Sequence, residues 1–96
     1  MKLSINQNNL RDLCKLNNIS YLGIFGSYSR GDEKKTSDID LLIDFKKTKS
    51  FFELAPIQAQ FEKIFRKPID LVLKNRIKKS FKPYIYKDLI PLYEKK

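Results

Sequence analysis

Two short motifs carry residues whose types and spacing suit phosphate and metal chemistry. The first is Gly26-Ser27-Tyr28-Ser29-Arg30-Gly31, which directly follows an apolar run that predicts a strand. Gly26 can adopt backbone angles closed to other residues, and Ser27 is the expected N-cap of a helix. The free N–H groups of a helix start favour a phosphate, and Arg30 could add a charged, bidentate donor. The motif therefore predicts a phosphate-holding turn.

The second motif supplies carboxylates. Asp38 and Asp40 open the next predicted strand, where alternation places both side chains on one face. Two neighbouring carboxylates repel each other unless a cation lies between them, although two solvated acids at a strand entry would look the same. Asp70 lies in a third apolar strand, where an acid is costly without a partner. That partner is either a cation shared with Asp38 and Asp40 or a Lys or Arg side chain.

Periodicity and turn residues predict the elements that position these motifs. The prediction is a mixed arrangement of helices and short strands in a single domain over residues 1–96. Its parts are a helix within residues 1–18 that starts near Asn6 to Asn8, strands at Ile19–Phe25, Asp38–Phe45 and Ile69–Leu73, a helix at Phe51–Arg66, and a terminal helix within Pro83–Glu94.

Local signals refine three of these elements. Ser50 and Glu53 form the pattern of a capping box at the start of the long helix. Pro56 should either kink that helix or mark its true beginning. Cys14 falls on the apolar face of the first helix and is expected in the core. Pro91 argues that the terminal helix is short or kinked.

Composition excludes several classes of protein. The chain has no His and one Cys, which excludes Ser-His-Asp catalysis, His-ligated zinc and an internal disulfide. No run approaches the ~20 apolar residues of a membrane span, and the expected location is the cytoplasm. The net charge of +9 suits an anionic partner or a lysine-rich surface. The aromatic residues fall mostly in apolar patterns, so a dedicated nucleic-acid reader is not favoured.

Taken together, the motifs resemble the nucleotidyltransferase signature of the DNA polymerase β superfamily, in the form found in MNT-type minimal nucleotidyltransferases. The resemblance spans about Tyr21 to Leu73 and includes Lys67-Pro68-Ile69-Asp70-Leu71-Val72. It implies an α/β (α+β) fold, a small mixed sheet flanked by helices. It also implies that Asp38, Asp40 and Asp70 are catalytic and hold two Mg²⁺ ions. In that family the positions of Gly26, Ser27 and Arg30 bind the nucleotide, and Asp70 lies where a base would act on the attacking hydroxyl.

The same resemblance implies a reaction and a partner. Free-standing MNT proteins are typically antitoxins whose partners are HEPN-domain ribonuclease toxins, and some transfer AMP from ATP to a Tyr of the toxin. Direct action on nucleic acid is not favoured, and self-association or a hetero-oligomer with the partner fits the small size. Two alternatives stay open. One is a non-catalytic antitoxin that neutralises its partner by binding, and the other is a nucleotidyltransferase for a small molecule or RNA.

Overall fold

The computed structural model of the chain describes residues 5–47 and 49–95, in which four strands alternate with helices. Residues 1–4, in the segment that precedes the expected helix start near Asn6 to Asn8, lie outside this description, as do residues 48 and 96. The helices are α1 (Gln7–Leu16), α2 (Ser27–Arg30), α3 (Phe51–Phe65) and α4 (Lys82–Lys87), with 3-10 turns η1 (Lys74–Arg76) and η2 (Lys79–Phe81). The strands are β1 (Ile19–Phe25), β2 (Ile39–Phe45), β3 (Ile69–Leu73) and β4 (Ile90–Glu94). No helix within the described residues is long and apolar enough to cross a membrane.

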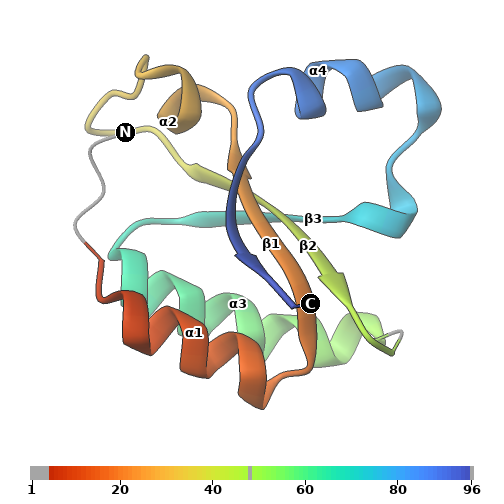
Figure 1. Cartoon of the computed structure of the whole chain (residues 1–96). Coiled ribbons are helices and arrows are strands. Elements are labelled where there is room, and N and C mark those ends of the chain that lie inside the picture. Colours follow the sequence, from red (N-terminus) through yellow and green to blue (C-terminus); the bar gives the residue numbers. More distant parts are fainter. Residues whose placement is uncertain (1–4, 48, 96) are drawn as a thin grey trace.

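The four strands form one mixed sheet in the order β3-β2-β1-β4. β1 lies antiparallel to both β2 and β4, whereas β2 and β3 run parallel and are joined by the crossover helix α3 (Figure 1). A parallel pair needs such a crossover, which explains why the longest helix lies between these two strands. The mixed sheet with flanking helices confirms the predicted fold class.

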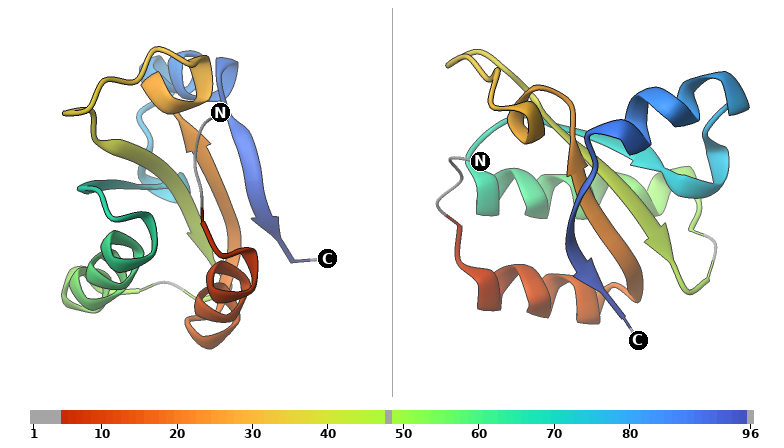
Figure 2. Two further views of the ribbon diagram at one scale, coloured as in Figure 1. Left: turned by 90° about the vertical axis from the view of Figure 1, so that its left-hand side faces the viewer. Right: turned by 45° about the horizontal axis from the view of Figure 1, so that its top comes forward.

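Helices α1 and α3 lie side by side and cover one face of the sheet, while α2 and α4 lie on the other side of the molecule (Figure 2). The core forms between the covered face and these two helices. Leu22 and Ile24 of β1 and Leu41 and Ile43 of β2 share that face, all fully buried. Side chains alternate along a strand, so Asp40 points to the opposite face. From the helices the core receives Leu10, Leu13, Cys14, Ile57, Phe61 and Phe65.

Several local predictions are confirmed at the helix ends. Asn6 caps α1 by accepting a hydrogen bond from the Asn9 N–H at 3.1 Å, and Asn18 beyond its end has a φ of 56°. At the start of α3 the Glu53 carboxylate accepts from the Ser50 N–H at 3.0 Å. Pro56 does not mark the beginning of that helix, since α3 starts at Phe51 and continues through it. Pro56 is exposed and is the sixth residue of α3, so the helix lacks the hydrogen bond that an N–H at this position would donate to the Phe52 carbonyl.

The predicted terminal helix is wrong over its second half. α4 ends at Lys87, and Ile90–Glu94 forms the edge strand β4 against β1. Pro91 stops a helix, but an edge strand tolerates it because one side of the strand makes no ladder hydrogen bonds. Leu92 and Tyr93 pack against the core. Their apolar character predicted such packing, but from the face of a helix and not from a strand.

Candidate active site

Two of the three predicted acids, Asp40 and Asp70, meet where β2 and β3 run parallel. Asp40 of β2 pairs in register with Asp70 of β3, so their side chains leave the same face of the sheet next to each other. The two carboxyl groups are close enough to share a hydrogen bond. Neither acid has a Lys or Arg partner within 4 Å among the described residues, where Arg30 makes both ion pairs. The alternative of a structural ion pair for Asp70 is therefore not found.

Asp38 lies just before β2, two residues ahead of Asp40. It is exposed, and its charge acts on Asp40. As the side chains stand, no three acidic, His or Cys groups within residues 5–47 and 49–95 converge tightly enough to hold a metal ion. The structure thus brings Asp40 and Asp70 together and leaves Asp38 beside them.

This arrangement makes ionisation of Asp40 unfavourable. Partial burial, together with the charges of Asp70 and Asp38, raises the pKa of Asp40 to about 6, while the positive charge of Arg30 lowers it. A carboxyl group that is crowded by two others ionises readily only when a cation joins it. Carboxylate oxygens are the ligands that Mg²⁺ prefers, so the donor set and its unbalanced negative charge both fit a divalent ion.

The turn between β1 and α2 lies directly against this acid. Phe25, the last residue of β1, pairs with Asp40. Gly26 follows with φ 77° and ψ −149°, and a Cβ atom there would overlap Asp40 Oδ2. Only glycine fits both the backbone angles and the space. Gly26 is also the N-cap of α2, with Ser27 as the first helical residue, so the prediction of Ser27 as the cap is wrong by one position.

The start of α2 offers hydrogen-bond donors next to the acids. The first internal bond of the helix runs from the Arg30 N–H to the Gly26 carbonyl at 3.2 Å. The N–H groups of Ser27, Tyr28 and Ser29 come before it and have no acceptor within the helix. The Tyr28 side chain is buried and anchors α2 to the core. Such donors, together with a short helix dipole, favour an anionic group.

Arg30 ends α2 and links it to the C-terminal part of the chain. Its Nε donates to Asp32 Oδ2 and its Nη1 to Asp88 Oδ2, each at 3.2 Å. These bonds use two of the five guanidinium N–H groups. The guanidinium is half exposed and lies near enough to Asp40 to lower its pKa.

Sequence reasoning missed Asp88, the residue that holds Arg30 against the end of α4. One signal was present, because Asp88 is the first acid after a stretch of six Lys or Arg residues at 74–87. A hollow of about 720 Å³ does not contribute to this site, since it lies at the opposite end of β1. Its lining includes Arg11, Lys15, Asn18 and Lys46, and none of the predicted site residues.

Comparison with known proteins identifies relatives of the chain. The family model described as polymerase beta, nucleotidyltransferase, matches residues 8–96. The chain is 30% identical over 69 residues to the protein adenylyltransferase MntA of Thermococcus cleftensis, which covers 72% of this chain and 70% of that protein. It is 37% identical over 59 residues to a Methanocaldococcus jannaschii protein provisionally named a protein adenylyltransferase, covering 62% of this chain and 69% of the relative.

Solved structures share the fold. A toxin–antitoxin structure with AMP-PNP superposes with a TM-score of 0.79 at 20% identity, covering 96% of this chain and 76% of the other. The complex of a tri-AMPylated HEPN toxin from Shewanella oneidensis with its MNT antitoxin gives a TM-score of 0.69 at 18% identity, covering 93% and 70%. At these identities the likeness shows the fold alone.

Proposed function

The chain belongs to the polymerase beta nucleotidyltransferase family, and we propose that it is a protein adenylyltransferase that acts as an antitoxin in the cytoplasm. In this proposal it transfers AMP from ATP to a Tyr hydroxyl of a HEPN-domain ribonuclease toxin. The observation that carries the proposal is the Asp40–Asp70 pair beside the Gly26 turn. Support for a protein acceptor comes from a relative named protein adenylyltransferase and from structural neighbours that contain an AMPylated HEPN toxin.

The chain's own residues divide between two tasks. The N–H groups that open α2, with Gly26 and Ser27, bind the β- and γ-phosphates of ATP, and Arg30 adds positive charge beside them. Asp70 is exposed on the open face, and it accepts the proton of the attacking hydroxyl. That hydroxyl oxygen bonds to the α-phosphorus as the bond from this phosphorus to the bridging oxygen breaks and pyrophosphate leaves.

Asp38, Asp40 and Asp70 are the proposed ligands of two Mg²⁺ ions. Their support is the carboxylate donor set and the raised pKa of Asp40, which burial and the charges of Asp70 and Asp38 cause and which a cation would offset. When bound, Mg²⁺ stabilises the charge that develops on the phosphoryl oxygens and on the attacking oxygen. Asp38 is exposed and precedes the strand, so its side chain is the one that must turn toward the pair.

The test is transfer itself. The purified chain is mixed with a co-expressed HEPN-domain partner, labelled ATP and Mg²⁺, and the intact mass of both proteins is measured. We expect the partner to gain one or more AMP groups. Asp38→Asn should reduce the rate at least 100-fold, because one of the proposed metal ligands is lost. Asp44→Asn is the matched control, since Asp44 lies on the same strand away from the three acids, and should transfer normally.

Two results would contradict the proposal. Full transfer by an Asp38→Asn, Asp70→Asn double variant would remove the acids from the chemistry. A stable complex that silences the partner without any mass gain would instead favour neutralisation by binding alone.

A further inference from the structure

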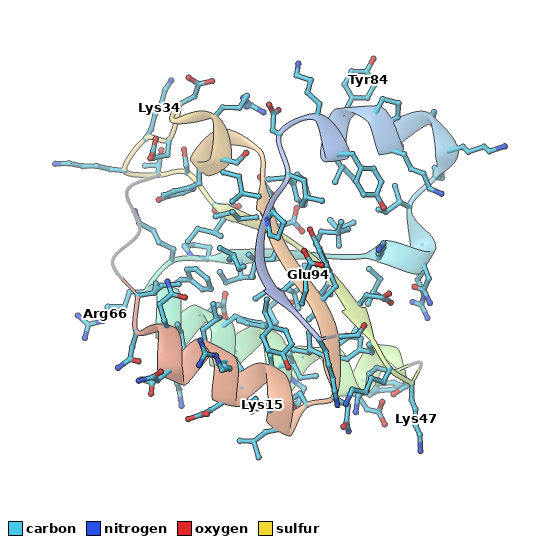
Figure 3. All side chains as sticks on the ribbon, in the orientation of Figure 1. Lys15, Lys34, Lys47, Arg66, Tyr84 and Glu94 are labelled. Atoms are coloured by element: carbon cyan, nitrogen blue, oxygen red, sulfur yellow. The ribbon has the colours of Figure 1, made fainter. Side chains whose placement is uncertain are left out.

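The exposed apolar side chains of this chain are not evenly distributed. Six large hydrophobic residues are exposed among those described, and four of them lie between residues 81 and 90. Phe81 is 55% exposed and Tyr84 73%, and Tyr86 and Ile90 complete the group. Figure 3 shows Tyr84 pointing away from the body of the molecule at the outer side of α4. Phe81 and Tyr84 are three residues apart and share one side of this helical segment, whereas Tyr86 lies toward Tyr21 of the sheet. Exposed aromatic side chains that are grouped, as Phe81 and Tyr84 are, mark an interaction site.

The same segment is strongly basic. Residues 74–87 contain six Lys or Arg residues and no acid, so they carry two thirds of the net charge of +9. All six basic side chains are exposed. The acid that follows, Asp88, is paired with Arg30 and therefore does not offset this charge. We call the exposed side chains of residues 74–90 the α4 surface.

The C-terminal end of α4 lies next to the proposed reaction centre. Asp88 caps the end of α4 and bonds to Arg30, whose charge acts on Asp40. Leu89 reaches the sheet itself, because a Cβ atom at Gly23 would lie 2.7 Å from Leu89 Cδ1. A molecule held on α4 would thus be held in a fixed position relative to the acids.

We propose that the α4 surface is the docking site for the protein acceptor, and that the acceptor presents an acidic surface with an apolar pocket or ridge. This inference rests on the proposed function and names the part of the chain that recognises the acceptor. Aromatic side chains within a charged rim are typical of the energetic centre of protein interfaces. The lysines around them favour an acidic partner and speed its approach.

A protein fits this surface better than RNA. Sequence-tolerant binding of single strands needs a basic groove that follows the backbone, with bases stacked along it. Here Phe81 and Tyr84 protrude from two short helical segments, η2 and α4, and do not line a groove. Transfer to a tyrosine also requires that the acceptor be a folded or extended polypeptide held near Asp70.

The experiment compares two matched double variants. Tyr84→Ser with Lys87→Glu changes the α4 surface, and Leu16→Ser with Lys15→Glu makes the same kinds of change at the far side of the molecule, where Lys15 is seen in Figure 3. AMP transfer is measured against acceptor concentration at saturating ATP and Mg²⁺. We expect the acceptor KM to rise at least tenfold for the α4 variant, with kcat and the ATP KM unchanged. The control should stay within twofold of the wild type.

A second measurement separates docking from chemistry. Binding of the HEPN-domain acceptor is measured by calorimetry in an Asp38→Asn background, with and without the α4 changes. Weaker acceptor binding caused by the α4 changes supports the docking site. An absence of AMP transfer by the wild type would contradict the proposed function but not the docking site. Unchanged acceptor binding and KM in the α4 variant overturn the docking site and leave adenylyl transfer intact. If the α4 changes abolish binding of a poly(U) oligonucleotide and leave acceptor binding unchanged, the α4 surface binds RNA. That result also overturns the proposed docking site for a protein acceptor.

Discussion

At the scale of single residues, the proposed chemistry depends on the unfavourable ionisation of Asp40. It lies half-buried between two other carboxylates, and burial and repulsion raise its pKa to about 6. The folded state therefore prefers the protonated acid. This preference stabilises the fold below the unfolded pKa near 4, and the stabilisation is lost as the pH rises through about 6.

We therefore predict that Asp40→Asn stabilises the cation-free protein. The amide cannot ionise, so its advantage appears above pH 6 and vanishes near pH 4. Screening at this partly exposed site limits the gain to about 1–2 kcal/mol, or roughly 5–10 °C in the melting temperature of a domain this size. Thermal unfolding between pH 4 and 8 measures it. Mg²⁺ with ATP should raise the melting temperature of the wild type and leave that of the variant unchanged.

Asp44→Asn serves as the comparison. Asp44 lies on the same face of β2, but its Oδ1 accepts from the Phe45 N–H and it has no carboxylate neighbour in the strand register. It should show no gain at any pH. A melting temperature of Asp40→Asn equal to or below that of the wild type at pH 8 would show that the three acids do not destabilise the fold.

At the scale of elements, the turn that joins β1 to α2 fixes the distance between the phosphate donors and the acids. Gly26 lies in a region of backbone angles that side chains avoid, and it lies against Asp40. Gly31 has a similar φ of 79°, yet a Cβ atom there would meet nothing within 4 Å. Gly31, with ψ 16°, carries only the strain of a left-handed residue, whereas Gly26, with ψ −149°, combines a more strained backbone with the contact to Asp40.

We predict that Gly26→Ala costs about 2–3 kcal/mol of stability and abolishes transfer, because strain and the clash with Asp40 add. Gly31→Ala should cost about 1 kcal/mol and keep most of its activity, because only the strain of a left-handed residue applies. Urea unfolding and the transfer assay measure both. Equal effects of the two substitutions would mean that contact with Asp40 is not what requires glycine at position 26.

The sequence alone predicts some helices and strands of this fold and not others. The strands β1, β2 and β3 and the helix α3 were predictable within one residue at most ends, because each has a clear apolar period and a clear breaker. β4 was not. Its alternation is short, and Leu92 and Tyr93 fit a helix face as well as a strand. Only the free edge of β1 decides between them, and that edge is a property of the assembled sheet.

The same contrast holds within the site. The pairing of Asp40 with Asp70 could be anticipated from alternation and from the order of the motifs. The Arg30–Asp88 contact joins residues 58 positions apart and depends on where α4 ends, so no local pattern predicts it. The sequence leaves open whether Tyr84 and Tyr86 serve as packing or as contact residues, and the structure leaves both exposed.

At the scale of the whole molecule, charge divides the surface into two unlike parts. Residues 74–87 supply six of the nine net positive charges. Helix α4 lies at the same end of the molecule as α2, whereas Arg76 borders Asp44 near the other end of β2 (Figure 1). Such a field raises the encounter rate with an acidic partner, and salt weakens it as the screening length falls from about 10 Å at 0.1 M to about 3 Å at 1 M.

We predict that the acceptor KM rises about tenfold between 0.05 and 0.5 M NaCl, while kcat at saturating acceptor changes less than twofold. Steady-state transfer with saturating ATP and Mg²⁺ measures both quantities. The Tyr84→Ser, Lys87→Glu variant should depend less steeply on salt, because part of the field is gone before any salt is added. The Leu16→Ser, Lys15→Glu variant loses the same charge on the far side and should retain the wild-type slope. If both variants reduce the dependence of the acceptor KM on NaCl equally, the total charge of the chain attracts the acceptor. The location of that charge on α4 then makes no difference.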